Sequence, residues 1–316
     1  MPALDASSPP PPPAERGDEV HWSDLPAGLA WAFRRAGHAV PALDITYGGD
    51  VPVGAGVSSS AAVAVAFALA WRRFGDFDID DVAVPQLCRE MENGYLGVQS
   101  GLMDQFASLL GRAGHALFLD CRSLDFERLP VSRDAAVVVF DSGVRRRLSE
   151  SGFNDRREEC RRAVDILEEH MPGIRALRDV DAAAFEQHSH HLPLALRHRA
   201  RHAVEEMARV LDGADALRRG DLAAFGTLMR RSHLSSRDFY QVSIPELDLL
   251  AAAAWPQSGC WGARMMGGGF GGCVAALVQA DAATAITQAV GDAFEAAYGR
   301  RPPAFTSALA DGAAIL

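Results

Sequence analysis

The sequence contains no lysine, and all 31 of its strongly basic residues are arginines. Any mechanism that needs a lysine amine is therefore excluded. A cationic side chain that binds phosphate has to be an arginine, whose planar guanidinium suits bidentate contacts. Basic residues are also outnumbered, because the formal net charge at pH 7 is −10. We therefore expect no broad electrostatic attraction to DNA, RNA or an anionic membrane.

Paired cysteines and long apolar runs are lacking too. The five cysteines are odd in number and widely spaced, without a CxxC pair, which is typical of a reduced, cytoplasmic protein. No basic region followed by an apolar run is found near residue 1, so no secretory signal is predicted. The longest apolar stretch, residues 61–71, is too short to span a bilayer. The sequence thus predicts a cytoplasmic protein without a membrane partner.

What the chain does contain is an ordinary globular composition, with 48% hydrophobic and 23% charged residues over 316 positions. Helical and strand-like patterns are mixed throughout, which predicts the α+β or α/β class. Residues 1–19, with five consecutive prolines at 9–13, are expected to form a disordered tail. A change in composition near residue 132 suggests two domains, 20–133 and 134–316.

Hydrophobic periodicity assigns most of the remaining chain. It predicts helices at residues 22–37, 80–93, 153–170 and 282–298, and mostly helical segments at 181–211 and 214–254. It predicts strands at residues 42–47, 116–120 and 137–140, and a glycine-rich loop followed by an apolar strand at 265–278.

Residues 51–70 contain the most informative segment. Gly54 and Gly56 precede three serines, Ser58, Ser59 and Ser60, and an Ala/Val/Leu helix follows. Glycines permit a tight turn and a close approach of backbone to ligand. Free N–H groups at a helix N-terminus favour an anion. This pattern indicates a phosphate-binding loop; a plain turn before a buried helix is the alternative.

Three separated stretches, residues 53–62, 97–105 and 267–273, resemble the second signature, the catalytic-aspartate segment and the third signature of galactokinases. These enzymes belong to the GHMP superfamily of small-molecule kinases. The resemblance covers about residues 21–316. It implies an α+β, two-domain GHMP kinase fold, with a ribosomal-protein-S5-like N-terminal domain and a ferredoxin-like C-terminal domain.

The activity implied by the resemblance is ATP-dependent phosphorylation of galactose at its C1 hydroxyl, with ATP and Mg²⁺ as cofactors. We expect the protein to be a monomer. Asp104 corresponds to the residue that accepts the hydroxyl proton or orients the hydroxyl; the sequence leaves this choice open. Ser60 and Glu92 match the metal ligands. Arg145 and Phe153 match positions near the substrate, although the family usually has a Tyr in place of Phe153. The residues that match the nucleotide-binding set are Gly54, Ala55, Gly56, Val57, Ser58, Ser59, Ser60, Ala61, Gly267, Gly268 and Gly269.

One expected segment is not found. Galactokinases carry a first signature of the Gly-Arg-Val-Asn-Leu-Ile-Gly-Glu-His-Thr-Asp-Tyr type upstream of the phosphate loop, and nothing in residues 1–50 resembles it. The N-terminal domain is therefore expected to be incomplete, without an arginine facing Asp104. Three interpretations remain open: a galactokinase whose start lies upstream, a relative that binds nucleotide without phosphorylating, and a kinase for another sugar or sugar acid.

Overall fold

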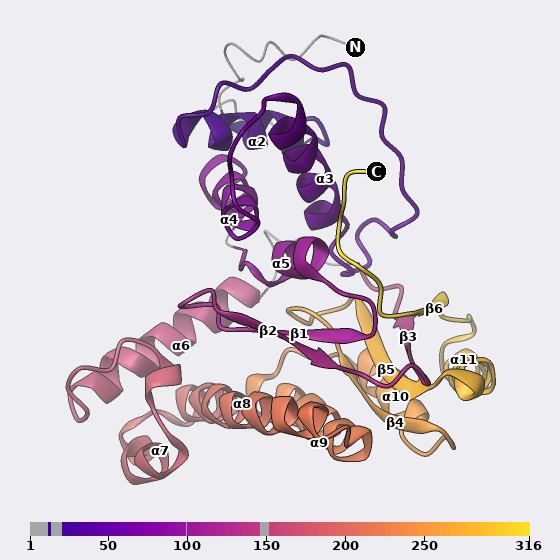
Figure 1. The fold of residues 1–316 in the computed structure, drawn as a ribbon. Coiled ribbons are helices and arrows are strands. Elements are labelled where there is room, and N and C mark those ends of the chain that lie inside the picture. Colours follow the sequence, from indigo (N-terminus) through magenta and orange to yellow (C-terminus); the bar gives the residue numbers. More distant parts are fainter. Residues whose placement is uncertain (1–11, 14–20, 99, 146–151) are drawn as a thin grey trace. The chain divides into compact units, whose positions relative to one another are not determined.

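The computed structural model describes residues 12–13, 21–98, 100–145 and 152–316. The chain divides into two compact units, whose elements are labelled in Figure 1. We call them the helical unit (Met1–Val53, Val57–Arg128 and Leu309–Leu316) and the sheet unit (Gly54–Gly56 and Leu129–Ala308). Most of the predicted tail, residues 1–11 and 14–19, lies outside the described residues. No helix of the described residues is long and apolar enough to cross a membrane.

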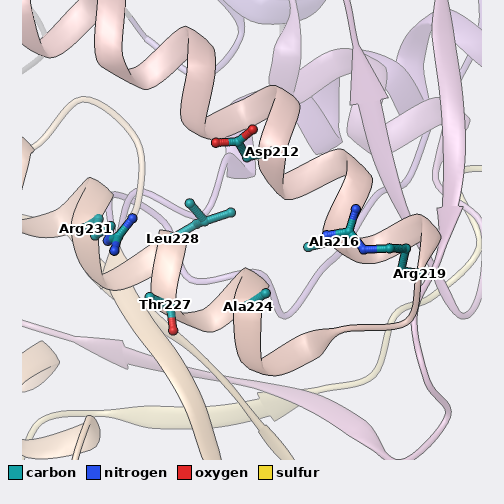
Figure 2. Close-up of a pocket in the computed structure, with 7 residues that line it drawn as sticks. All are labelled: Asp212, Ala216, Arg219, Ala224, Thr227, Leu228 and Arg231. Carbon is teal, nitrogen blue, oxygen red and sulfur yellow. The ribbon is translucent and has the colours of Figure 1, made fainter.

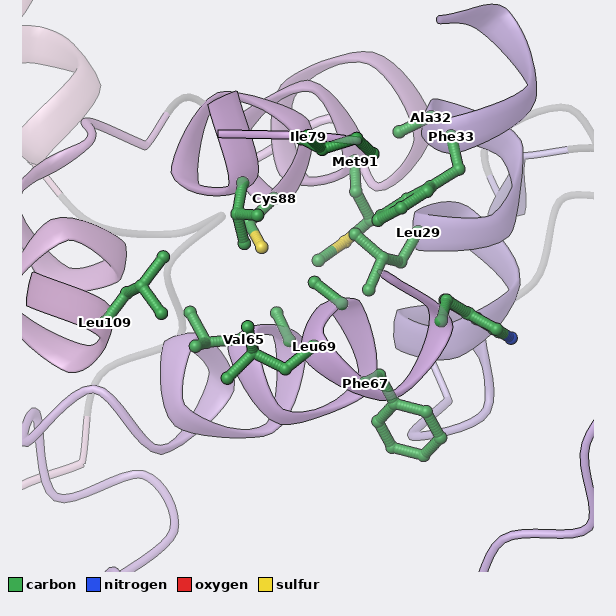
Figure 3. Close-up of a cluster of buried hydrophobic side chains, with 14 of the residues drawn as sticks. Leu29, Ala32, Phe33, Val65, Phe67, Leu69, Ile79, Cys88, Met91 and Leu109 are labelled. Carbon is green, nitrogen blue, oxygen red and sulfur yellow. The ribbon is translucent and has the colours of Figure 1, made fainter. Parts of the chain in front are cut away.

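Among its described residues, the helical unit contains four α-helices, one π-helical turn and a two-stranded sheet, whose second strand ends in residues assigned to the sheet unit. These elements are α2 (Asp24–Arg35), α3 (Ser59–Phe74), α4 (Ala83–Glu90), η1 (Met91–Tyr95), α5 (Met103–Leu110), β1 (His115–Leu119) and β2 (Phe126–Pro130). Their apolar faces enclose one core, in which Leu29, Phe33, Val65 and Met91 are fully buried (Figure 3).

The helix predicted at residues 22–37 is confirmed as α2. Its first turn carries Asp24 and its last turn Arg34 and Arg35, so charges at both ends complement the helix dipole. Gly37 follows with φ of +90°, a value that glycine adopts without strain at a helix end.

The strand predicted at residues 42–47 is wrong. Residues 38–50 have no regular secondary structure. A strand needs a neighbour to pair with its backbone. In the described part of this unit, β1 and β2 pair only with each other, in a sheet of two. The alternating pattern of the segment could not reveal that a partner strand was lacking.

The sheet unit contains a four-stranded antiparallel sheet in the order β4-β5-β3-β6. Its strands are β3 (Ala135–Asp141), β4 (Cys260–Met265), β5 (Cys273–Gln279) and β6 (Ala304–Ser307). β3 pairs with β5 from Ala135↔Gln279 to Asp141↔Cys273. Apolar side chains from one face of the sheet form a core with α10 (Pro245–Ala254) and α11 (Ala283–Tyr298). The strands predicted at 116–120 and 137–140 are thus confirmed as β1 and β3, whereas β2, β4 and β6 were not predicted.

The remaining helices of the sheet unit lie mostly between β3 and β4 in the chain. They are α6 (Phe153–Glu168), η2 (Leu177–Asp179), α7 (Ala182–His188), η3 (Ser189–His191), α8 (Leu194–Arg218), α9 (Leu222–Ser235), η4 (Ser236–Tyr240) and, after β5, η5 (Ala280–Ala282). α8 runs unbroken through Gly213, between the two helical segments predicted at 181–211 and 214–254. A Cβ there would lie 3.3 Å from the ring of Phe225 on α9, so the glycine allows close packing of the two helices.

Candidate active site

The first glycine-rich segment leads into α3 through residues with positive φ. Gly54, Gly56 and Ser58 have φ values of 73°, 77° and 62°; glycine adopts such values readily, whereas a serine does so rarely. Ser58 is the N-cap of α3, yet its side chain caps no backbone N–H. The Ser58 side chain therefore does not occupy the first-turn N–H groups of α3, the kind of groups that can bind an anion; the phosphate-binding loop stays a prediction.

The second glycine-rich segment lies against the first within the sheet unit. The thiol of Cys273 donates a hydrogen bond to the carbonyl oxygen of Ala55, at 2.9 Å and across 218 positions of the chain. The Cα of Gly272 lies 3.5 Å from the position that a Cβ on Gly56 would occupy. Burial, with a contribution from Asp141, raises the pKa of Cys273 to about 12, so the thiol keeps the proton that it donates.

The end of β3 fixes this second segment. The backbone N–H and the hydroxyl of Ser142 both donate to the carbonyl oxygen of Gly272, at 2.9 Å and 2.6 Å. Gly271 has φ of 133°, and a Cβ on it would lie 2.6 Å from the carbonyl oxygen of Val144. Only glycine fits at so close an approach of two backbones.

A bidentate ion pair lies beside the first glycine-rich segment. Arg145 donates from both terminal nitrogens to the two carboxylate oxygens of Asp141, each at 2.7 Å, and the N–H of Gly143 adds a third bond at 2.8 Å. Burial raises the pKa of Asp141, but these hydrogen bonds and the arginine charge outweigh it and leave the pKa below its ordinary value. The Cδ of Arg145 lies 3.6 Å from the position of a Cβ on Gly54.

The helical unit contains a buried carboxylate, Glu92, which is 6% exposed. It lies on the π-helical turn η1, and such turns occur often at functional sites. The hydroxyl of Ser100 and the amide of Gln105 both donate to its Oε2, the latter at 2.8 Å. Burial raises the pKa of Glu92, the Ser100 and Gln105 hydrogen bonds oppose this, and the charge of Asp104 adds to it.

Asp104 lies in the first turn of α5, one residue before Gln105. Its charge contributes to the raised pKa of Glu92. α3, α4 and α5 pack against one another, and η1 continues α4 directly. The first turn of α3, Glu92 and Asp104 therefore belong to adjoining elements of one unit.

The structure distributes the predicted residues over both units. The helical unit holds Val57, Ser58, Ser59, Ser60, Ala61, Glu92 and Asp104; the sheet unit holds Gly54, Ala55, Gly56, Gly267, Gly268, Gly269, Arg145 and Phe153. Ser60 is exposed, whereas Ala61 is 1% exposed and can offer a ligand only its backbone. Phe153 begins α6, and its side chain lies outside what the structure describes.

Sequence reasoning assigned no role to five further residues of these networks. They are Ser100, Gln105, Asp141, Ser142 and Cys273. For Asp141 and Ser142 a signal exists, because polar side chains follow a buried apolar strand directly. The contact between Gln105 and Glu92 joins two helical segments through side chains, and no spacing rule indicates it.

The carboxylate of Glu92 could hold a divalent cation such as Mg²⁺. Both hydrogen bonds that Glu92 receives within the described part of the chain end on Oε2, which leaves Oε1 to a ligand. Mg²⁺ is usually bound through one or two carboxylates together with water and phosphate oxygens. The described residues contain no set of three His, Cys, Asp or Glu side chains that could hold a metal. Phosphate and water oxygens would therefore complete the coordination.

A hollow between α8 and α9 of the sheet unit holds none of the predicted site residues. It measures about 300 Å³ and is lined by Asp212, Ala216, Arg219, Ala224, Thr227, Leu228 and Arg231 (Figure 2). Its lining includes several exposed side chains, and no buried polar group points to a ligand there.

Comparisons with known proteins first define a class. Residues 24–112 match the GHMP kinases N terminal domain, and residues 214–296 match the GHMP kinases C terminal domain. Homoserine kinase from Cytophaga hutchinsonii has the same fold, with a TM-score of 0.60 at 19% identity over 91% of this chain and 76% of that structure. The chain has the two-domain GHMP kinase fold with mixed helix and sheet content.

Within that class the chain belongs to the galactokinase family. It is 43% identical to the galactokinase of Roseiflexus sp. (strain RS-1), over 92% of this chain and 74% of the relative. It is 36% identical to that of Bacillus subtilis (strain 168), over 93% and 76%. The crystal structure of Lactococcus lactis galactokinase complexed with galactose matches with a TM-score of 0.86 at 34% identity, over 93% of this chain and 76% of that structure.

Proposed function

We propose that this chain transfers the γ-phosphoryl group of ATP to the C1 hydroxyl of galactose, giving galactose 1-phosphate and ADP. Membership of the galactokinase family supports the reaction and the substrate. The structural observation that carries the proposal is the meeting of the two glycine-rich segments through Cys273 and Ala55. Phosphoryl transfer depends on positioning and charge stabilisation, and a glycine-rich backbone before a helix N-terminus can supply both to a phosphate.

The nucleotide phosphates are proposed to bind along the loop from Gly54 to Ala61, against the first-turn N–H groups of α3. Gly267, Gly268 and Gly269 would support the nucleotide from the second segment. Arg145 contacts phosphate rather than sugar in this proposal, because its side chain lies beside Gly54. As the chain has no lysine, an arginine has to supply any cationic side chain at this position.

Ser60 and Glu92 are proposed to hold Mg²⁺. The bound ion would neutralise charge on the phosphate oxygens during transfer. Glu92 offers Oε1, which receives no hydrogen bond within the described part of the chain, and Ser60 offers an exposed hydroxyl at the start of α3.

Asp104 is proposed to accept the proton of the C1 hydroxyl. As the bond from the sugar oxygen to the γ-phosphorus forms, the bond from that phosphorus to the bridging oxygen breaks and ADP leaves. The proton passes from the hydroxyl to the carboxylate of Asp104. Phe153 is proposed to lie near the sugar, where it can supply an apolar contact but no hydroxyl.

The test is galactose-dependent release of ADP by the purified 316-residue chain with Mg-ATP, beside the Asp104→Asn variant. We expect turnover in the wild type and a loss of about 10²- to 10⁴-fold in kcat in the variant. A folded, nucleotide-binding wild-type chain without turnover would contradict the proposal. A panel of sugars and sugar acids identifies the acceptor, and light scattering after size exclusion checks the predicted monomer.

A further inference from the structure

The carboxylate of Glu92 receives hydrogen bonds from neighbouring side chains in addition to offering an oxygen to a metal ion. Two side chains of the helical unit converge on one carboxylate oxygen of Glu92. The hydroxyl of Ser100 donates to Oε2 of Glu92, and Nε2 of Gln105 donates to the same atom at 2.8 Å. The backbone N–H of Ser100 donates to Oδ1 of Asn93 at 2.9 Å, which fixes Ser100 to the π-helical turn that carries Glu92.

The two donors to Oε2, Ser100 and Gln105, come from different parts of the chain. Gln105 is 2% exposed and lies on α5, whereas Ser100 precedes that helix in the chain. Two donors on one oxygen hold the carboxylate plane in one orientation and satisfy that oxygen only. The other oxygen, Oε1, is left for a ligand, and a carboxylate with one occupied and one open oxygen suits monodentate coordination of Mg²⁺.

Gln105 supplies a second, independent observation. Its Oε1 is buried and has no hydrogen-bond partner in the described part of the chain. Buried polar atoms are rarely left without a partner, so this acceptor calls for a donor that arrives with a ligand. Water molecules that accompany a hydrated divalent cation are donors of that kind, and Mg²⁺ usually keeps several of them.

We propose that Ser100 and Gln105 are positioning residues for the divalent-cation site at Glu92. They act through the carboxylate of Glu92 and not on the sugar. This inference rests on the proposed function, because it assigns supporting residues to the cation site of that reaction. Support of this kind typically contributes about 10- to 100-fold to metal affinity.

The test uses Gln105→Met, which keeps the length of the side chain but removes both its donors and its acceptor. Mn²⁺ serves as the probe, and its binding in the presence of ADP is measured by electron paramagnetic resonance without turnover. We expect the Kd for Mn²⁺ to rise about ten-fold. The Mg²⁺ concentration for half-maximal rate should rise in parallel, with the KM for galactose within about two-fold of the wild type.

Matched variants separate positioning from folding. Ser100→Ala removes the second donor to Glu92, which lies outside the helices, and should weaken Mn²⁺ binding in the same way. Ser100→Thr keeps the hydroxyl and should bind Mn²⁺ as the wild type does. Gln86→Met, at an exposed position of α4, and Ser108→Ala, on α5, should bind Mn²⁺ as the wild type does. If Gln105→Met does not fold, the Ser100 variants decide.

Wild-type Mn²⁺ affinity in folded Gln105→Met or Ser100→Ala would overturn the inference. Failure of the proposed function has a different signature. In that case the wild-type chain would show no galactose-dependent turnover, while the variants would still lose Mn²⁺ affinity.

Discussion

The two units hold their charged groups in different ways. In the sheet unit, buried or partly buried acids meet arginines: Asp141 binds Arg145, and Glu206 binds Arg209 and Arg264. In the helical unit, by contrast, neutral groups surround Glu92, and the charged group that shifts its pKa is another carboxylate, Asp104. Arginines thus compensate Asp141 and Glu206 in the sheet unit, whereas the described residues provide no arginine partner for Glu92.

This difference has consequences for ligands and for pH. A cation that binds only the folded helical unit stabilises it by mass action, and the paired acids of the sheet unit offer no such response. Shifts of acid and histidine pKa values also change the pH dependence of folding stability, and they can do so in opposite directions. A raised acid pKa makes the fold more stable as pH falls, whereas a lowered histidine pKa makes it less stable.

The largest effect we expect is acid destabilisation of the sheet unit at His202 on α8. This side chain is 8% exposed, bonds the hydroxyl of Ser235 at 2.9 Å and stacks on Tyr240. Burial lowers its pKa to about 4 from 6.5; Glu206 opposes this, while Arg209 and Arg264 add to it. Between pH 6.5 and pH 4, His202 binds a proton more readily in the unfolded chain than in the folded chain. The contribution of neutral His202 to stability is therefore complete above pH 6.5 and declines as pH falls toward 4. At pH 5 the loss is about 2 kcal/mol.

Urea unfolding at pH 7.5 and pH 5.0, with hydrogen exchange of α8 as the local readout, measures this loss. His202→Gln keeps a polar side chain that does not titrate, so the difference between the wild type and the variant isolates the histidine. Equal pH dependence in both proteins would show that another group carries the effect.

A smaller effect is expected when the sheet unit loses one of its ion pairs. Asp141→Asn removes the carboxylate that holds Arg145 beside Gly54. We expect the KM for ATP to rise about ten-fold, equivalent to about 1.4 kcal/mol, and the KM for galactose to stay unchanged. The loss of stability should be only about 1 kcal/mol, because Arg145 is half exposed and solvent screens the pair.

Asp292→Asn is the matched control for this change. Asp292 pairs with Arg301 at an exposed position of the same unit, so its variant should keep the wild-type KM for ATP. An unchanged KM in Asp141→Asn as well would remove Arg145 from the proposed nucleotide site.

Local signals predicted much of this fold and failed wherever partners from elsewhere in the chain decide the structure. Hydrophobic periodicity predicted α2 and α11. Gly54 and Gly56, predicted to form a tight turn, have the positive φ values that such a turn can require. The strand predicted at 42–47 failed because pairing is not local. The short edge strand β6, with mostly exposed residues, had no apolar pattern to identify it.

The candidate site divides in the same way. Motifs indicated Asp104, Glu92 and both glycine-rich segments, because each is a continuous stretch of sequence. The residues that support them were not assigned, since Cys273 reaches Ala55 and Gln105 reaches Glu92 only in the folded chain. Sequence therefore indicated the groups proposed to touch the ligands, and the structure adds the groups proposed to orient them.

The smallest effect tests the comparison most directly. Glu92→Gln removes the buried charge of the helical unit but keeps an oxygen that can accept hydrogen bonds from Ser100 and Gln105. Because burial and Asp104 raise the pKa of Glu92, its ionised form opposes folding at neutral pH, and this cost disappears as pH falls through the raised pKa. Without divalent cation we expect the variant to melt about 2 °C higher than the wild type, whereas Asp141→Asn melts lower.

Adding Mn²⁺ and ADP should then raise the wild-type melting temperature more than that of Glu92→Gln. A fall in the melting temperature of Glu92→Gln, measured by calorimetry at pH 7.5, would mean that the charge of Glu92 is already compensated, and the contrast between the units would not hold.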